Sequence, residues 1–143
     1  MEEFTLDTRL KADTIEIADL NISKLLLMND KNYPWFIIVP KKANAVEIFD
    51  LDDLSQKLLF QEISKVSEYL KRFYRADKVN IGALGNQVSQ LHIHVIMRYK
   101  TDIAWPNPVW GYTLAIKYSE EEIEGIRNDI AKLVADVDRG MKE

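Results

Sequence analysis

The amino-acid sequence predicts an α+β domain in which an antiparallel sheet of about five strands carries one long helix and a C-terminal helix. Three observations support this fold class. Short apolar runs bounded by turn formers occupy the first 40 residues and the region from 78 to 99. Apolar residues recur at helical spacing after residue 50 and again after 119. The order strands, helix, strands, helix favours antiparallel pairing.

The strand predictions rest on apolar or alternating runs that end at turn formers or at proline. Segment 29–34 is rich in turn formers and joins two such runs, so these two runs are expected to pair antiparallel. Pro40 ends the second of them. The expected strands are 14–22, 24–28, 35–39, 78–83 and 91–99.

Two helices are expected because apolar residues return every three or four positions. The first starts at Asp50, where Asp50 and Asp53 resemble a capping box. The second starts at Ser119 and is capped with Glu122. The apolar stripe of the first helix comprises Leu51, Leu54, Leu58, Leu59, Ile63, Val66, Leu70 and Phe73. The stripe of the second comprises Ile123, Ile126, Ile130, Leu133, Val134 and Val137.

Length and composition indicate a globular protein with one domain over residues 1–143. The chain has 143 residues, of which 47% are hydrophobic and 29% charged. A net charge of −4 does not favour a nucleic-acid polymer or a membrane as partner. The absence of cysteine excludes disulfides and thiolate chemistry. We expect a cytoplasmic protein, because neither a signal peptide nor an apolar run of about 20 residues is found.

The strand at 91–99 carries the most informative side chains. Side chains alternate between the two faces of a strand, so Gln90, His92 and His94 share one face while Leu91, Ile93, Val95 and Met97 form an apolar one. His92 and His94 are the only histidines in the chain. An imidazole titrates near neutral pH, which suits it to nucleophilic or acid-base chemistry.

Three interpretations of this pair compete. The histidines could be hydrogen-bonded surface residues, or they could share a metal ion, although no further histidine or cysteine is available as a ligand. The third interpretation is covalent phosphoryl or nucleotidyl chemistry, in which a neutral imidazole attacks phosphorus. Segment 82–87 leads into the strand as a small polar loop with two glycines, and turn amides of this kind bind anions. We favour the third interpretation, which predicts neither a metal nor another cofactor.

Segment 85–96, with the sequence GNQVSQLHIHVI, resembles the signature of the histidine triad (HIT) superfamily, His-φ-His-φ-His-φ-φ after a Gly-Gln-Ser/Thr-Val type loop. Segment 35–42, WFIIVPKK, is similar to the apolar strand that ends in Pro-Lys or Pro-Arg in that family. The resemblance covers a motif-bearing core of about 24–100, and residues 101–143 supply a C-terminal loop and helix.

The resemblance implies a role for individual residues. His92 matches the nucleophile that takes a nucleotidyl group from an α-phosphate, and His94 matches the histidine that contacts the phosphate. Asp30 resembles the acidic residue on the ribose hydroxyls. Asn80 and the segment Asn86-Gln87-Val88 resemble the polar shell around the α-phosphate. The implied protein is a homodimeric nucleotide hydrolase or nucleotidyl transferase that takes a nucleotide or nucleotide conjugate, with a purine base.

Gln90 departs from the signature, because it stands where the first histidine is expected. A glutamine donates and accepts hydrogen bonds but does not titrate between pH 5 and 8. An orienting role would therefore survive at Gln90, whereas a titrating role would not. The alternative to an active enzyme is a nucleotide-binding or regulatory protein with a weak or inactive site, and a metal-binding domain is less favoured still.

Overall fold

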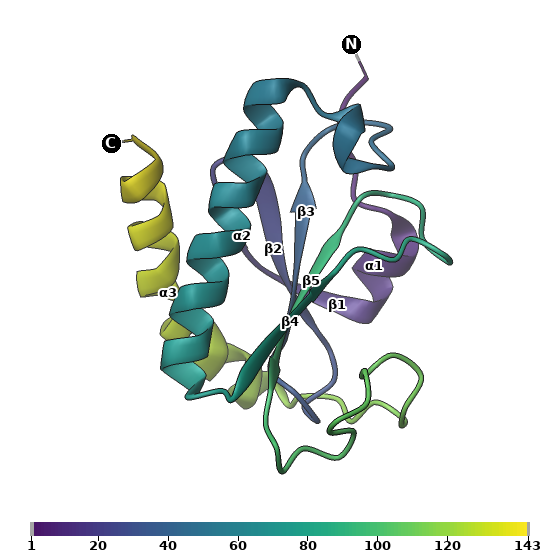
Figure 1. Ribbon diagram of the computed structural model, residues 1–143, viewed down its shortest axis with the longest axis vertical. Coiled ribbons are helices and arrows are strands. Elements are labelled where there is room, and N and C mark those ends of the chain that lie inside the picture. The colour runs from purple at the N-terminus through teal and green to yellow at the C-terminus, as the bar shows by residue number, and fades with distance from the viewer. Residues whose placement is uncertain (1, 143) are drawn as a thin grey trace.

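The computed structural model describes the backbone of residues 2–142 and the side chains of residues 2–137. This part of the chain forms a five-stranded antiparallel sheet with helices against it (Figure 1). The elements are α1 Thr8–Asp13, β1 Thr14–Asp19, β2 Ser23–Met28, β3 Trp35–Pro40, the 3-10 turn η1 Ile48–Asp50, α2 Asp53–Tyr74, β4 Lys78–Gly82, β5 Ile93–Arg98 and α3 Glu120–Lys142. The predicted fold class is confirmed.

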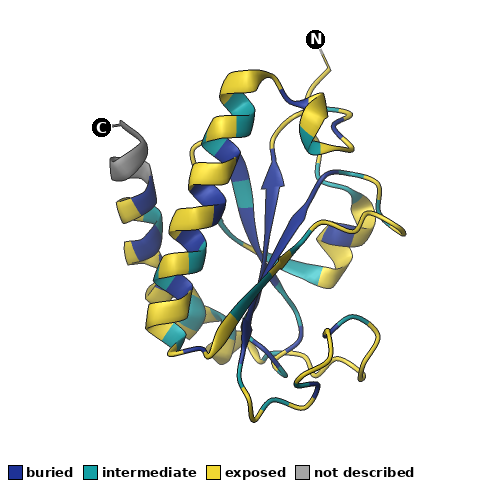
Figure 2. Ribbon diagram, in the orientation of Figure 1, coloured by how far each residue is buried: buried dark blue, intermediate teal, exposed yellow. Residues whose placement is uncertain are grey.

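The strands lie in the order β1-β2-β3-β5-β4, so β5 runs between β3 and β4. All residues of β3 and β5 are buried, whereas the edge strands β1 and β4 are partly exposed (Figure 2). In the register of the sheet, His94 pairs with Ile37 on one side and with Gly82 on the other. The histidine strand therefore has neighbours on both sides along its length.

The two faces of the sheet pack against different elements. Ile93, Val95 and Met97 of β5 join the larger core, which also contains the apolar faces of α2 and α3. Ile96 of β5 belongs to a second cluster, which includes Leu10 of α1 and Val109 of the segment after β5. The alternation expected for the strand is confirmed, and the histidines lie on the face away from α2 and α3.

The start of α2 differs from the sequence prediction. The helix begins at Asp53, and Asp52 is its N-cap, with a carboxylate that accepts the backbone N–H of Ser55 at 2.7 Å. Asp50 instead closes the turn before the helix, where it accepts the N–H groups of Val46 and Glu47. Three aspartates at 50, 52 and 53 offer similar caps, and the tertiary position of the turn selects among them. The capping of α3 by Ser119 and Glu122 is confirmed by reciprocal hydrogen bonds of 3.1 and 2.9 Å.

Several other elements differ in extent. The first strand ends at Asp19, the fourth at Gly82, and β5 begins only at Ile93, so that His92 lies just before the strand. The six-residue helix α1 was not expected from the sequence, because six residues are too few to show an apolar period. Among the described residues, no helix is both long enough and apolar enough to span a bilayer.

Candidate active site

His92 is held by the backbone of its own loop. Its Nδ1 lies 2.7 Å from the carbonyl oxygen of Gln90, and the side chain is largely buried, with 7% exposed. A carbonyl oxygen only accepts hydrogen bonds, so Nδ1 of neutral His92 carries the proton. Nε2 then carries a free lone pair. The geometry thus presets the tautomer that a nucleophile needs.

His94 is held in the opposite tautomer. The indole Nε1–H of Trp35 donates to His94 Nδ1 at 3.0 Å, which leaves the imidazole proton on Nε2. Burial and, to a smaller extent, the neighbouring His92 lower the pKa of His94 to about 4. At neutral pH this residue is an uncharged N–H donor. The two imidazole centroids are 5.0 Å apart.

A cavity of about 280 Å³ opens beside His92. Gly85, Ser89 and segment 46–49 are among the residues that line it. Gly85 has φ +71°, a left-handed conformation that glycine adopts without strain. The lining contains no lysine or arginine, so an anionic group in this cavity would depend on N–H and O–H donors.

Gln90 does not turn its amide toward the other two members of the motif. Its Oε1 accepts the backbone N–H of Asp7 at 2.9 Å, and its Nε2 donates to the carbonyl of Thr5, also at 2.9 Å. The Gln90 amide therefore bonds one backbone N–H and one backbone carbonyl of the N-terminal segment, as a peptide group of a neighbouring strand would. Its backbone carbonyl is the group that contacts His92.

The indole of Trp110 packs against the imidazole of His94. Its ring lies 5.3 Å from that of His94 at an interplanar angle of 80°, and it also meets Trp35 edge-on. A Cβ built on Gly82 would lie 3.2 Å from the indole of Trp110, so the absence of a side chain there lets the ring approach β4. The indole Nε1 of Trp110 is buried without a hydrogen-bond partner among the described residues.

Asp30 and Asn80 are engaged in other hydrogen bonds of the fold. The carboxylate of Asp30 accepts the N–H and side-chain amide of Asn32 and the N–H of Ile116, which ties the β2–β3 turn to the segment before α3. Asn80 accepts from the guanidinium of Arg98 at 2.8 Å. Neither residue lines the cavity beside His92.

Asn86, Gln87 and Val88 lie in the loop between β4 and β5. Asn86 and Gln87 are exposed, while Val88 packs against the second core cluster. The structure therefore brings His92, His94 and Gln90 together and places the other predicted binding residues around them or farther away. Contact of any of these residues with a ligand stays a prediction.

Sequence reasoning missed several residues of the site. Ser89 and segment 46–49 line the cavity, and Trp35 orients His94. The contact of Trp110 with His94 has no signal in the sequence, because the two residues lie far apart along the chain. Strand alternation puts the side chains of Trp35 and Phe36 on opposite faces, but the register between β3 and β5, which brings Trp35 to His94, cannot be read from the sequence.

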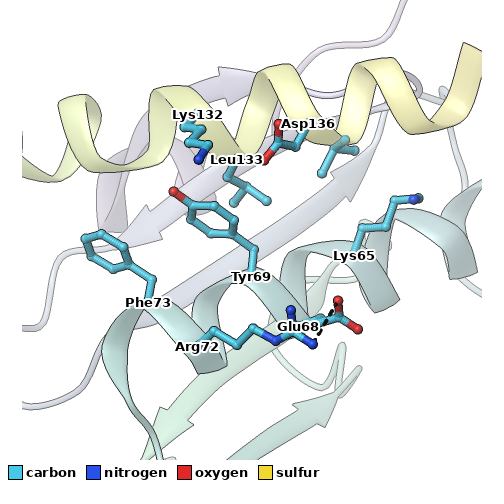
Figure 3. A pocket seen from close by; sticks show the side chains of 9 residues that line it. Lys65, Glu68, Tyr69, Arg72, Phe73, Lys132, Leu133 and Asp136 are labelled. Carbon is cyan, nitrogen blue, oxygen red and sulfur yellow. Dashed lines mark ion pairs between the residues drawn. The ribbon is translucent and has the colours of Figure 1, made fainter.

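A larger groove lies between α2 and α3, on the other face of the sheet (Figure 3). It measures about 530 Å³ and is lined by charged side chains such as Lys65 and Asp136 around the ring of Tyr69. The sheet separates this groove from the histidines, so it takes no part in the site. Among the described residues, no group of three or more His, Cys, Asp or Glu side chains is arranged to hold a metal ion.

Comparison with known proteins gives a consistent result. A family model described as HIT domain matches residues 9–101. Among solved structures, a histidine triad protein from Bradyrhizobium japonicum is 45% identical over 93% of this chain and 99% of that chain, with a TM-score of 0.90. One from Sinorhizobium meliloti is 46% identical over 90% and 96%, with a TM-score of 0.88. One from Marinobacter aquaeolei is 39% identical over 95% and 99%, with a TM-score of 0.93. No curated protein matches the chain by sequence.

Proposed function

Because the chain belongs to the HIT family, we propose that it is a nucleotide hydrolase or nucleotidyl transferase that acts at an α-phosphate through a nucleotidyl-histidine intermediate. The contact of His92 Nδ1 with the carbonyl of Gln90 carries this proposal, since it leaves the Nε2 lone pair free beside a cavity. We propose a purine nucleotide or one of its conjugates as the substrate, because the resemblance to the family implies it.

The proposed reaction proceeds in two displacements. In the first, the lone pair of His92 Nε2 forms a bond to the α-phosphorus while the bond from phosphorus to the leaving group breaks, and the leaving group takes the electron pair. In the second, water attacks the same phosphorus, the P–N bond breaks, and its electron pair returns to Nε2. The water proton passes to solvent. If another acceptor replaces water, the outcome is transfer.

Other residues stabilise the charge that develops on phosphorus. The Nε2–H of His94 is a preset donor for a phosphoryl oxygen, because Trp35 occupies the other ring nitrogen. The loop around Gly85 lines the cavity beside His92, and we propose its backbone amides as further donors. Asp30, Asn80, Asn86, Gln87 and Val88 complete the proposed binding set on the strength of the resemblance alone.

The leaving group is constrained by the state of the two flanking residues. Gln90 carries no titratable proton, and the pKa of His94, about 4, leaves it uncharged at neutral pH. Neither residue is thus a strong acid toward a departing oxygen or nitrogen. We propose that phosphoanhydrides, whose phosphate leaving groups depart without protonation, react faster than phosphoramidates of the same nucleoside.

Rapid-quench intact-protein mass spectrometry tests this function. The panel contains dinucleoside polyphosphates, aminoacyl adenylates and nucleoside phosphoramidates. We expect a mass increase of one nucleotidyl group on the wild type and none on His92→Ala, with the phosphoanhydrides giving the faster turnover. The exposed Gln61 of α2 supplies a control, Gln61→Ala, which should behave as wild type. No adduct and no turnover across the panel would exclude the proposed chemistry.

A protein that binds nucleotides with little or no turnover is the second candidate, and the side chain at position 90 favours it. The amide of Gln90 bonds the backbone of Thr5 and Asp7 and carries no titratable proton, so nothing at this position replaces a titrating histidine. Calorimetry distinguishes the two candidates. Nucleotide affinity that is the same in wild type and His92→Ala, together with the absence of an adduct, would establish the binding protein.

We also propose that the protein is a homodimer in which the sheets of two copies meet at β4. Strand β4 is an edge of the sheet, and edge strands present unpaired backbone groups. The exposed apolar side chains Ile81 and Phe60 lie beside this edge, where a cavity of about 440 Å³ is lined mostly by apolar side chains. A second copy would cover both the backbone groups and the apolar surface.

A further inference from the structure

The N-terminal segment before α1 reaches the base of the histidine strand, and Gln90 is the residue that connects them. Two hydrogen bonds of 2.9 Å join the Gln90 amide to the backbone of Thr5 and Asp7, more than 80 residues away in the chain. The segment also has contacts that do not involve Gln90. Phe4 and Leu6 contact the second core cluster, and Glu2 hydrogen-bonds Asn44.

The loop that holds Gln90 is anchored by the side chain of Leu91, which is buried in the larger core, and hydrogen bonds supply two further restraints. It precedes β5, which begins at Ile93, so residues 90–92 receive no support from the sheet ladder. One restraint comes from the N–H of Leu91, which donates to the carbonyl of Ala45 at 2.9 Å. The other is the pair of bonds from the Gln90 side chain to the N-terminal segment. The side chain of Gln90 is therefore fixed by that segment, and the segment adds to the restraint that the buried Leu91 places on the peptide of residue 90.

The orientation of residue 90 matters because its carbonyl contacts Nδ1 of His92 at 2.7 Å. A rotation of this peptide would remove the acceptor that keeps the imidazole proton on Nδ1. Nε2 would then carry the proton in part of the population, and an Nε2–H imidazole has no lone pair with which to attack phosphorus at that atom.

We infer that Gln90 is a positioning residue, which uses the N-terminal segment as a splint to hold the reactive tautomer of His92. A glutamine suits this task because its amide oxygen and one of its two amide N–H groups can pair with a backbone as a peptide group does. Gln90, at the first motif position, thus contacts His92 through its backbone carbonyl. Its side chain binds the N-terminal segment. The inference rests on the proposed function only for its effect on the reaction rate.

The N-terminal segment also lines a second cavity that adjoins the one beside His92. A cavity of about 620 Å³ lies between residues 2–8 and segment 43–46, and it is also lined by Ser89 and Gln90. Val46, Ser89 and Gln90 line the cavity beside His92 as well, so the two cavities adjoin. Release of the segment would therefore alter the surroundings of His92 as well as its tautomer.

Two pairs of variants test the inference. Gln90→Ala removes both bonds to the segment, and Gln61→Ala is its control. Asp7→Pro removes the N–H that Gln90 accepts, and the φ of −51° at Asp7 is compatible with proline. Asp7→Ala is its matched control, because both variants lose the carboxylate that caps α1 but only the proline variant loses the N–H.

The readout is the imidazole nitrogen spectrum, which contains two side chains in this protein. We expect His92 to be in the Nδ1–H form in the wild type and both controls, and to become a mixture of tautomers in Gln90→Ala and Asp7→Pro. In Gln90→Ala, amide exchange at Asp7 should accelerate about five- to tenfold, as the loss of one hydrogen bond predicts. The rate of adduct formation should fall about tenfold in both test variants.

The outcomes separate the inference from the proposed function. If amide exchange at Asp7 accelerates while the His92 spectrum stays that of the wild type, Gln90 only anchors the segment and the inference is wrong. If the tautomer changes as expected but even the wild type forms no adduct, the positioning role stands and the proposed chemistry fails. A normal adduct rate with an unchanged tautomer in Gln90→Ala would overturn the inference and leave the chemistry intact.

Discussion

The two histidines differ in chemical state although they are two residues apart on one face of the sheet. His92 contacts a carbonyl through Nδ1, and His94 receives an indole N–H at the same atom. One ring therefore carries its proton on Nδ1 and the other on Nε2. The difference arises from the two partners and suits the two proposed roles, nucleophile and hydrogen-bond donor.

The low pKa of His94 has a consequence for stability. The ordinary value is 6.5, and in the folded protein it falls to about 4 because the ring is buried. The unfolded state therefore binds a proton more readily, so the stabilisation is complete above pH 6.5 and is lost as the pH falls toward 4. A shift of this size corresponds to about 3 kcal/mol of unfolding free energy.

Urea unfolding at pH 7.0 and 4.5 measures this effect. The wild type should lose stability between the two values through both His94 and the carboxylates. His94→Asn keeps an acceptor for Trp35 but does not titrate, so its pH dependence should be flatter by most of the His94 contribution. Equal pH dependence in the two proteins would show that His94 retains an ordinary pKa.

At the scale of elements, the segment between β5 and α3 is positioned by one buried ion pair. Arg98, at the end of β5, forms two hydrogen bonds to Asp102, at 2.8 and 3.0 Å, and both side chains are almost fully buried. The same carboxylate accepts the N–H groups of Ala104 and Trp105. This anchor starts the loop that brings Trp110 onto His94, and Gly82 provides the space for its indole.

A pair of glycine substitutions tests the packing of this indole. Gly82→Ala places a methyl group 3.2 Å from Trp110, and the rigid ring must move, at a cost of about 1–3 kcal/mol in unfolding free energy. Gly125→Ala is the control, since Gly125 lies in α3 with no atom within 4 Å of its added Cβ. It should stabilise the protein by about 0.5–1 kcal/mol. Urea midpoints with the near-ultraviolet dichroism of tryptophan report both, and an unperturbed Trp110 in Gly82→Ala would contradict the close contact.

The elements also show what the sequence could and could not predict. Strand β3 and the start of helix α3 were predicted within about one residue, because Pro40 and the Ser119–Glu122 box are local signals that need no tertiary context. The start of α2 was wrong, since Asp50, Asp52 and Asp53 are equivalent caps by sequence. Helix α1 gave no signal at all, and it is held by contacts with Gln90 and the second core cluster.

The same reasoning applies to the site. His92, His94 and Gln90 were predicted as site residues from their spacing, because strand alternation alone places them on one face. The partners that decide their states come from residues 5–7 and from Trp35, and these pairings depend on register and on long-range packing. The role of Gln90 was therefore open from the sequence, although its identity was plain.

At the scale of the whole molecule, the sheet separates two packed layers of the protein. The face covered by α2 and α3 holds the larger core, and the opposite face carries the histidines, the N-terminal segment and the loop with Trp110. Strand β4 contacts both layers. Gly82 on β4 contacts Trp110, while Ile81, its neighbour, points to the other face and is 53% exposed. Pairing at this edge would thus support the site from outside.

The proposed dimer is tested at the same edge. Ile81→Lys puts a charge on the apolar surface beside β4, and burying it in a dimer would be unfavourable, so we expect a monomer in sedimentation equilibrium where the wild type is a dimer. Glu16→Lys is the control, because it places the same side chain on β1, the opposite edge of the sheet, and should leave the dimer intact. A monomeric wild type, or dissociation caused only by Glu16→Lys, would exclude β4 as the interface.

If dimerisation at β4 also braces Gly82 against Trp110, the monomeric variant should lose part of its adduct rate while His92 keeps the Nδ1–H tautomer, since that tautomer depends on Gln90.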